Sequence, residues 1–323
     1  MANIKDVAKM ANVSVATVSR VINNKGYVHE DTRKLVEEAI KKLNYIPNEF
    51  ARILLQKVSK MIGVIFPHLT NSFYYNVLEG IEEEAFNNGY KVMICNSHED
   101  EIREEEYIKQ FIKYNIDGLI TGSNSNIFYR YRELNIPIVS IDRRIDSDIP
   151  SVSSNNFGGG YLAAEKLIEK GCKNLVHFRG PSNLFTVQER TRGYDKCLNK
   201  YGMYSWQIDL DFLNPDRDVI RSFFELHTDI DGVFCDSDII AAIVISELQK
   251  LGKNIPNDVQ IIGYDNTYLA SLLTPKLSTI SQRMYSIGKE AMISLNKLLN
   301  EEIDFEYHKL VPVDFVERET TKN

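Results

Sequence analysis

The sequence VSVATVSRVIN, residues 13–23, decides the fold of the N-terminal part of the chain. Ser14 has a side-chain oxygen that can cap the free amide groups of a helix running from Val15 to Asn23. Within this helix the apolar side chains recur at helical spacing and form an inner stripe, whereas polar and basic side chains face outward. The stripe consists of Val18, Val21 and Ile22, and the outer face consists of Ala16, Thr17, Ser19, Arg20 and Asn23.

One further helix is predicted before this stretch and another after it. Asn3 and Asp6 suit the first turn of a helix, because they satisfy its free amide groups and complement its dipole. Asn12 suits the left-handed residue that ends that helix. A third helix is expected from about Asp31 to Leu43, with an inward stripe of Leu35, Ala39, Ile40 and Leu43. Two short helices joined by a tight turn form a helix-turn-helix, whose second helix enters the major groove of DNA.

The outward side chains of the helix at 15–23 suit base reading. Arg20 can donate two hydrogen bonds to guanine, and Val15 and Ala16 can contact thymine methyl groups. Thr17 and Ser19 can bind phosphates. On pattern alone, the alternative is that this helix is an ordinary part of a small core, which is the commoner case for an amphipathic helix.

Charge is distributed unevenly along the 323 residues. Residues 1–60 contain eleven Lys and Arg against six Asp and Glu, a net charge of +5, and the remainder contains 27 against 39, a net charge of −12. A basic segment of this kind suits contact with a polyanion, although chance variation along the chain could produce the same split.

Composition predicts a cytosolic protein of about two folding units. Hydrophobic residues make up 43% and charged residues 26%, which excludes a disordered or collagen-like chain. No apolar run is long enough to span a membrane and no signal peptide is recognisable, so no membrane partner is expected. The four cysteines lie far apart and lack histidine at metal-ligand spacing, so we expect reduced, buried thiols. They are Cys95, Cys172, Cys197 and Cys235.

From about residue 61, short β-branched apolar runs alternate with helical patterns. This alternation predicts an α/β body of two lobes, each a doubly wound parallel sheet with ligand chemistry at the carboxyl ends of its strands. Strands are expected at residues 62–66, 91–95, 118–121, 138–141, 175–178, 232–235 and 259–262. Helices are expected at residues 77–86, 104–114, 159–170, 189–201 and 239–251.

Polar side chains follow several of these apolar runs. They include Asn96, Asp142, Arg143, Asp236, Ser237, Asp238, Asp265 and Gln282. Any one of them could merely cap the next helix, but several that converge on one cleft favour a binding site, because their hydrogen bonds need a common polar partner. The sequence carries no phosphate-binding loop, nucleophile elbow or zinc motif, so neither a cofactor, a metal nor an enzymatic activity is predicted.

Three blocks of the N-terminal segment carry a family resemblance. Residues 4–8, residues 13–23 and residues 43–48 with Ala51-Arg52 resemble, in order and spacing, the DNA-binding head of the lactose/galactose repressor (LacI/GalR-type) family. The resemblance implies a hinge helix at about residues 48–56 that wedges Leu54, with Ala51 beside it, into the minor groove. An ordinary linker helix packed on the body is the alternative. The implied DNA-binding residues are Ile4, Ser14, Val15, Ala16, Thr17, Ser19, Arg20, Asn23, His29, Thr32, Tyr45, Ala51 and Leu54.

The body resembles the same family over essentially its whole length, and through it the periplasmic sugar-binding proteins. The blocks that carry this resemblance are residues 71–74, 142–143, 188–194, 234–241, 263–265 and 277–282. It implies a sugar site in which aromatic rings stack on the sugar and Asp and Arg bind its hydroxyl groups. The implied residues are Asn71, Phe73, Tyr74, Asp142, Arg143, Arg190, Ser237, Asp238, Asp265 and Gln282. Ser237 stands where ribose-binding relatives have Asn, so a sugar larger than ribose or differently oriented could fill the space.

The resemblance implies a ligand-controlled transcriptional repressor that binds palindromic double-stranded operator DNA as a homodimer and is released by a small-molecule effector, a sugar. The expected domains are a helix-turn-helix domain at 1–58 and a ligand-binding and dimerisation domain at 61–323. Within the latter, the first lobe is expected at about 61–157 and 285–317 and the second at about 158–284. Three alternatives stay open: DNA binding enhanced by a purine-type corepressor or a phosphorylated carrier protein, a transport-type solute-binding protein, and an enzyme.

Overall fold

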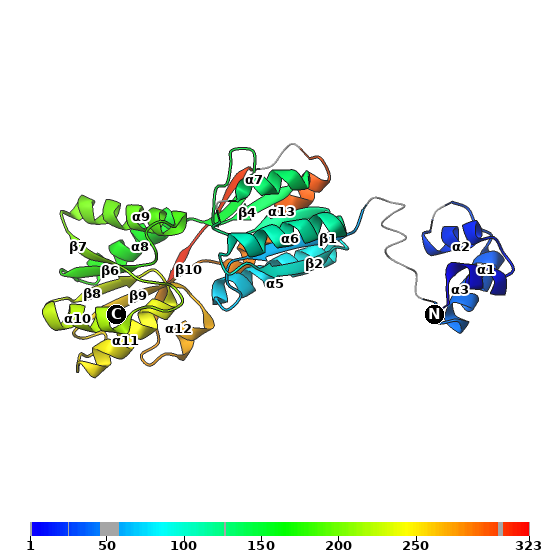
Figure 1. Ribbon diagram of the computed structural model, residues 1–323. Helices are drawn as coiled ribbons and strands as arrows, with labels where there is room; N and C mark the ends of the chain where they lie inside the picture. The colour runs from blue at the N-terminus through cyan, green and yellow to red at the C-terminus, as the bar shows by residue number, and fades with distance from the viewer. Residues whose placement is uncertain (1, 25, 46–57, 126, 303–305, 323) are drawn as a thin grey trace. The chain divides into compact units, whose positions relative to one another are not determined.

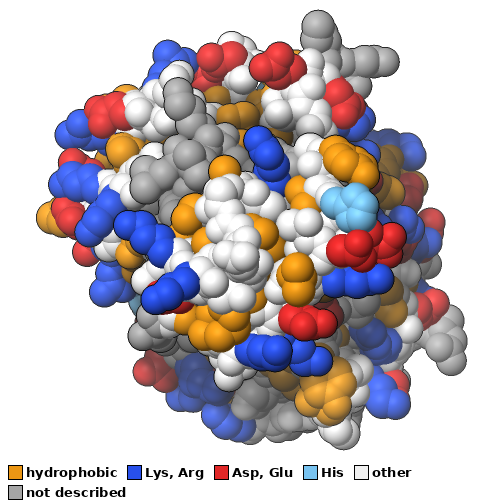
Figure 2. Space-filling model, turned by 90° about the vertical axis from the view of Figure 1, so that its right-hand side faces the viewer, with side chains coloured by type: hydrophobic (Ala, Val, Ile, Leu, Met, Phe, Trp, Pro, Cys, Tyr) orange, Lys and Arg blue, Asp and Glu red, His pale blue; other side chains and the backbone are white. Residues whose placement is uncertain are grey.

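The computed structural model describes residues 2–24, 26–45, 58–125, 127–302 and 306–322 (Figure 1). The chain divides into two compact units, Met1–Ser59 and Lys60–Asn323, which we call the head and the body. Within the described ranges no helix is both long enough and apolar enough to cross a membrane. On the face drawn in Figure 2, basic, acidic and apolar side chains are interspersed.

The described part of the head consists of three helices: α1 (Ile4–Met10), α2 (Val15–Ile22) and α3 (Glu30–Lys42). The predicted caps are present. The Asn3 side chain accepts a hydrogen bond from the amide of Asp6 at 3.2 Å, and Ser14 Oγ accepts one from the amide of Thr17 at 3.1 Å. Asn12 has a φ of 52°, the left-handed conformation expected of it. The helix-turn-helix prediction is therefore confirmed.

The head has its own small apolar core. The prediction was wrong for one residue of this core. Leu35 was expected to face inward but is 53% exposed, whereas Val36 is fully buried. Because α3 begins at Glu30, residues 36, 39, 40 and 43 share the face that packs on the other two helices. The buried core residues are Val7, Ala8, Ala11, Val18, Val21, Val36 and Ala39.

Two six-stranded sheets form the body, which confirms the predicted pair of α/β lobes. The first sheet has the order β11 (His308–Val311), β5 (Ser151–Ser154), β4 (Ile138–Ile141), β3 (Gly118–Thr121), β1 (Met61–Phe66), β2 (Lys91–Asn96). The second has the order β12 (Asp314–Val316), β10 (Ser278–Ser281), β9 (Gln260–Asp265), β8 (Gly232–Cys235), β6 (Leu175–Arg179), β7 (Ser205–Asp209). All neighbouring strands are parallel except β10 and β12.

Helices cover both faces of each sheet (Figure 1). On the first sheet, one face packs against α5 (Ser72–Asn87) and α13 (Met284–Leu299), and the other against α6 (Glu101–Tyr114), α7 (Phe128–Tyr131) and the short 3₁₀ helix Arg132–Leu134. On the second sheet, one face packs against α8 (Asn156–Glu169) and α9 (Phe185–Tyr201), and the other against α10 (Arg217–Leu226), α11 (Asp238–Lys250) and α12 (Tyr268–Leu272). All four cysteines are buried and free, as expected.

The chain passes between the two sheets three times. The three passages lie between β5 and α8, between β10 and α13, and between β11 and β12. Short segments of this kind can act as hinges that let two lobes change their separation. The last passage differs from the expected lobe boundary at residue 317, because β12 pairs with β10 in the second sheet.

Candidate DNA-reading helix and ligand cavity

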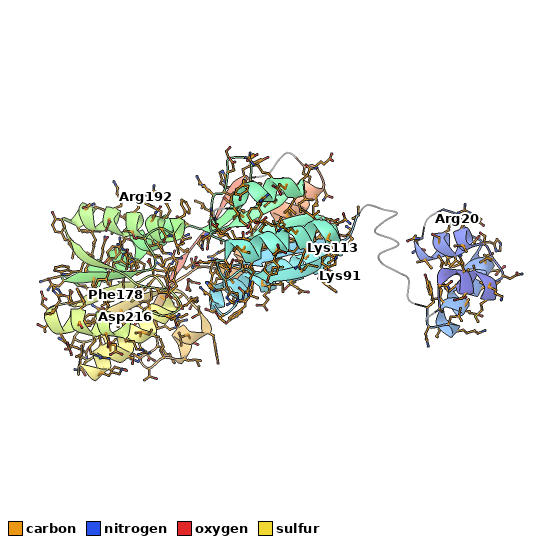
Figure 3. The ribbon with its side chains drawn as sticks, viewed as in Figure 1. Arg20, Lys91, Lys113, Phe178, Arg192 and Asp216 are labelled. Carbon is orange, nitrogen blue, oxygen red and sulfur yellow. The ribbon has the colours of Figure 1, made fainter. Side chains whose placement is uncertain are left out.

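The outward face of α2 is accessible in the head. Val15 is 41% exposed, Ala16 and Arg20 are also exposed, and Thr17 and Ser19 are half-buried. Figure 3 shows Arg20 on this helix. Its guanidinium makes no hydrogen bond or ion pair with any other residue of the described ranges, so all of its donors remain available for a guanine base.

Some residues predicted to bind DNA make hydrogen bonds or apolar contacts within the head. Ser14 Oγ lies 2.9 Å from Thr17 Oγ1, and Asn23 Nδ2 donates to the carbonyl oxygen of Ser19 at 2.8 Å. Ile4 and Tyr45 pack against the apolar core. These side chains therefore stabilise the motif, whatever further contact they make with DNA.

The remaining predicted DNA-binding residues lie just before α3, within it or beyond it. His29 is exposed just before this helix, with its Nδ1 atom 3.4 Å from the Asp31 carboxylate, and Thr32 is half-buried in the first turn. Ala51 and Leu54, and with them the expected hinge helix, lie outside the described residues.

The body contains a cavity of about 130 Å³ whose lining comes from both sheets. One water molecule needs about 10–15 Å³ on the same measure, so the cavity suits a ligand of on the order of ten non-hydrogen atoms. Eight of the ten residues that the sequence assigned to ligand binding line it: Asn71, Phe73, Tyr74, Asp142, Arg190, Ser237, Asp265 and Gln282.

Two of the ten predicted ligand residues do not line the cavity. Arg143 Nη1 donates to the carbonyl oxygens of Ser123 and Ser125, at 3.0 and 2.6 Å, and so holds the loop that follows β3. The carboxylate of Asp238 is fully buried and accepts hydrogen bonds from the amide and hydroxyl of Thr267. Both side chains support the walls, because their hydrogen bonds are used within the protein.

Arg190 is the main cationic group of the cavity. It lies on α9 and is only 5% exposed. Its Nε donates to Asn156 Oδ1 at 2.8 Å, its Nη1 donates to the carbonyl oxygen of Asp236 at 2.7 Å, and its guanidinium lies 3.8 Å from the ring centre of Tyr264. These contacts fix the plane of the guanidinium. Arginine has five N–H groups, so donors remain for a ligand.

Acceptor atoms also line the cavity. Gln282 Nε2 donates to Asp265, so its Oε1 is held as an acceptor, and this buried oxygen has no partner within the described ranges. Asp142 accepts a hydrogen bond from the amide of Ser154 at 3.3 Å. Burial raises the pKa of Asp142 to about 6 and also raises the pKa of Asp265, and in both cases Arg190 opposes the rise. Burial therefore disfavours the charged form of both carboxyl groups.

The backbone at both carboxyl groups is unusual. Asp142 has a φ of 54° and Asp265 a φ of 112°, in the left-handed half of conformational space that residues other than glycine rarely adopt. Such conformations cluster at ligand sites, where the surrounding structure holds them in place. This observation supports a binding role for the two strand ends.

Four aromatic rings contribute to the cavity wall: Phe73, Tyr74, Phe185 and Phe212. Tyr74 packs against both Phe66 and Phe73, with ring centres 4.9 and 5.1 Å apart. Two of the four rings were not predicted. Aromatic walls of this kind bind the C–H faces of a sugar, while the polar groups around them bind its hydroxyls.

Sequence reasoning missed a second set of lining residues. They are Pro67, His68, Glu99, Gly122, Asn124, Ile141, Leu184, Phe185, Thr186, Asp211, Phe212, Leu213 and Ile239. Asp236, one of the polar residues predicted at a strand end, also lines the cavity. Several of the missed residues follow a strand directly or within three residues, namely Pro67 after β1, Glu99 after β2 and Asp211 after β7. The rule that ligands bind at the carboxyl ends of parallel strands could have found Pro67 and Glu99, which follow predicted strands, whereas the strand before Asp211 was not predicted.

Comparison with known proteins matches both units. The family model described as "Bacterial regulatory proteins, lacI family" matches residues 3–48. The model described as "Periplasmic binding proteins and sugar binding domain of LacI family" matches residues 59–319.

Individual relatives match over most of the chain. This chain is 38% identical over 323 residues to the ribose operon repressor of Halalkalibacterium halodurans. The alignment covers 100% of this chain and 98% of that protein. A periplasmic binding protein/LacI transcriptional regulator from Alkaliphilus metalliredigens, solved with D-xylulofuranose, is 31% identical, covers 82% and 100% of the two chains and has a TM-score of 0.74. The lac repressor dimer, solved with operator and the anti-inducer ONPF, is 25% identical, covers 99% of each chain and has a TM-score of 0.91.

Proposed function

Because the chain belongs to the LacI family of bacterial regulatory proteins, we propose that it represses a sugar-utilisation operon and that a bound sugar releases it from its operator. The function is regulatory and not enzymatic. The carrying observation is that one chain combines an exposed helix suited to base reading with a sugar-sized cavity lined from two lobes. We place the protein in the cytoplasm, because operator DNA lies there.

The DNA-binding part of the proposal rests on the outward face of α2. Arg20 reads guanine in the major groove, and Val15 and Ala16 contact thymine methyl groups. Ser19 and Thr17 add phosphate contacts that orient the head. Leu54, with Ala51 beside it, is assigned to the minor groove on the family resemblance alone, because both residues lie outside the described ranges.

The sugar part of the proposal rests on the chemistry of the cavity and on two relatives. The mixture of aromatic rings with Arg190, Asp142 and Asp265 suits a ring that has apolar faces and a hydroxyl periphery. The relative with 38% identity is named for the ribose operon, and the relative with 31% identity was solved with a furanose. Both names favour a sugar of about five carbons.

A homodimer completes the proposal, because one head offers few base contacts and a twofold axis matches a palindromic operator. In the body, β2 is an edge strand of the first sheet, and exposed apolar side chains occur on β2 and on the flanking α5 and α6. They are Tyr75, Phe86, Ile94, Ile102 and Ile112. We propose this surface as the contact between the two copies.

The effector acts by shifting a conformational population. A sugar that contacts both sheets stabilises the closed arrangement of the lobes. The lobes reach this arrangement by rotating about the three chain passages between the sheets. In the dimer, closure alters the spacing of the two points at which the heads are attached, and operator affinity falls.

A DNA-binding assay with the full chain tests the first half of the proposal. Fluorescence anisotropy on fragments of the DNA flanking its own gene is expected to locate a palindromic site. Arg20→Ala should weaken that binding by at least a hundredfold, whereas Lys196→Ala, which removes one exposed positive charge from α9, should leave it unchanged at the same salt concentration. Equal affinity and equal sequence preference for the wild type and Arg20→Ala would refute the assignment of α2.

Adding sugars to the same assay tests the second half. The expected result is that one sugar lowers operator affinity of the wild type but not of Arg190→Ala, whose fold is checked by circular dichroism. A ligand that raises operator affinity would instead establish corepression, and the proposed release mechanism would be wrong.

A further inference from the structure

The polar lining of the cavity demands hydrogen-bond donors from its ligand. Gln282 Oε1 is buried and unpartnered, and its orientation is fixed because the amide nitrogen of the same side chain donates to Asp265. The carboxylate oxygens of Asp142 and Asp265 are also acceptors. A buried acceptor that stays unpaired costs about 1–3 kcal/mol, so a matching ligand must donate to this wall.

Acidic side chains outnumber basic ones in the lining. Among the described lining residues, five carry carboxyl groups: Glu99, Asp142, Asp211, Asp236 and Asp265. The basic ones are Arg190 and His68. Arg190 already donates hydrogen bonds to Asn156 and to the backbone of Asp236, so only part of its guanidinium remains for a ligand.

Two of these carboxylates, Glu99 and Asp211, have no described cation to balance them. Glu99 follows β2 of the first sheet and makes no hydrogen bond or ion pair with another side chain of the described ranges. Asp211 follows β7 of the second sheet, and its Oδ1 accepts hydrogen bonds from the amides of Leu213 and Asn214, at 2.8 and 2.7 Å. Both are exposed lining residues, so a ligand entering the cavity meets their charge from the two lobes at once.

We propose that the cavity selects an uncharged polyhydroxyl ligand, a free sugar as opposed to its phosphate ester, and that Glu99 and Asp211 are the residues that impose this selection. The proposal rests on the proposed function and specifies its effector. A phosphate monoester carries about −1.5 to −2 charges at neutral pH, so it meets repulsion from Glu99 and Asp211, and its phosphate group supplies acceptors where Gln282 Oε1 needs a donor. A free hydroxyl in the same place donates a hydrogen bond and carries no charge.

Matched pairs of sugar and sugar phosphate test the proposal on the full-length protein. The probes are D-ribose, D-xylulose, D-fructose and D-glucose, each beside its terminal phosphate ester, measured by thermal shift and calorimetric titration at low ionic strength. We expect at least one free sugar to bind, with an affinity at least a hundredfold above that of its ester. In the double variant Glu99→Gln/Asp211→Asn this ratio should shrink on the order of tenfold, and the difference between variant and wild type should fade as salt is added.

A second double variant supplies the control. Glu225→Gln/Glu302→Gln removes two exposed carboxylates from the two lobes away from the cavity, so it changes the net charge equally and should leave the ratio unchanged. An equal drop in both double variants would show that overall charge, not Glu99 and Asp211, determines the ratio, and would overturn their assignment.

The outcomes separate this inference from the proposed function. An ester that binds as tightly as its parent sugar, and still relieves repression, would overturn the selection while leaving a sugar-type effector in place. If none of the sugars or sugar phosphates bound, both the sugar effector and the proposed selection would be rejected.

Discussion

Each lobe of the body contains a pair of helices that cross closely at a glycine, but only in the second lobe does this crossing contact a ligand-binding residue. In the first lobe α5 crosses α13 so closely that a Cβ on Gly288 would lie 1.8 Å from the carbonyl oxygen of Val77. In the second lobe α8 crosses α9 so closely that a Cβ on Gly160 would lie 1.9 Å from the carbonyl oxygen of Arg190. The position of the main cation of the cavity thus depends directly on a glycine contact in the second lobe, whereas the contact in the first lobe falls one turn beyond Tyr74.

Replacing these glycines tests that difference and should give the largest effects. Gly160→Ala and Gly288→Ala each force a methyl group into a backbone carbonyl, so each should destabilise the body by about 3 kcal/mol or more, measured by urea unfolding. Gly160→Ala should in addition lower the ligand affinity of the folded protein by more than tenfold, because the backbone of Arg190 must shift. If Gly288→Ala lowered ligand affinity as much, the two crossings would be functionally equivalent and the comparison would fail.

The two arginines predicted to bind ligand provide the next test. Arg190 lines the cavity, whereas Arg143 holds the loop at Ser123 and Ser125, next to the lining residue Asn124. Arg190→Ala should therefore lower ligand affinity on the order of hundredfold, the loss of charge-assisted hydrogen bonds. Arg143→Ala should lower it by only about fivefold, through the displaced loop. Isothermal titration of both variants measures the ratio, and equal losses would restore Arg143 to direct ligand binding.

The carboxyl groups of the two lobes predict a pH dependence of intermediate size. Burial raises the pKa of Asp142 to about 6, so the folded body retains a proton that the unfolded chain loses between about pH 4 and pH 6. Stability should therefore fall as pH rises through that window, by about 1 kcal/mol per pH unit. Asp265, whose pKa is also raised by burial, should contribute a fall of the same sign from the second lobe.

Two neutral variants separate these contributions. Asp142→Asn should flatten the dependence of unfolding free energy on pH between about pH 4 and pH 6, and Asp265→Asn should flatten part of the dependence that remains. The measurement is urea unfolding at a series of pH values. A slope that neither variant changes would place the proton uptake elsewhere in the body.

The apolar strands of the body were predicted from the sequence, whereas a strand rich in polar residues was missed. Residues 118–121 and 138–141 were predicted with their observed ends, because a short, mostly apolar run is typical of a strand buried on both faces. Ser151–Ser154 was missed although all of it is buried. Ser151 Oγ lies 2.9 Å from His308 Nδ1, a partner distant in sequence that the local pattern does not reveal.

The same limit applies to the site. Four of the eight predicted lining residues, Asp142, Ser237, Asp265 and Gln282, follow predicted apolar runs, and the carboxyl ends of parallel strands meet at the cavity. The other four, Asn71, Phe73, Tyr74 and Arg190, were assigned from the family resemblance. The direction in which a side chain points could not be predicted from the sequence. Arg143 follows β4 as expected, but its guanidinium donates to the carbonyl oxygens of a neighbouring loop. Leu35 and Val36 show the same limit in the head, since a shift of one residue in the helical register exchanges the inner and outer positions.

Ser237, on the second lobe, gives the smallest expected effect on stability. Its Oγ caps α11 by accepting a hydrogen bond from the amide of Ile240 at 3.2 Å, and it also lines the cavity. Asn caps a helix as well as Ser does, so Ser237→Asn should change the unfolding free energy by less than about 0.5 kcal/mol. Its larger amide should narrow the cavity and lower the affinity for hexoses relative to pentoses by about tenfold, measured by competition titration. Ser237→Ala should lose about 1 kcal/mol of stability with no such shift. If Ser237→Asn left the preference unchanged, the residue would serve α11 alone, and sugar choice would depend on the aromatic walls.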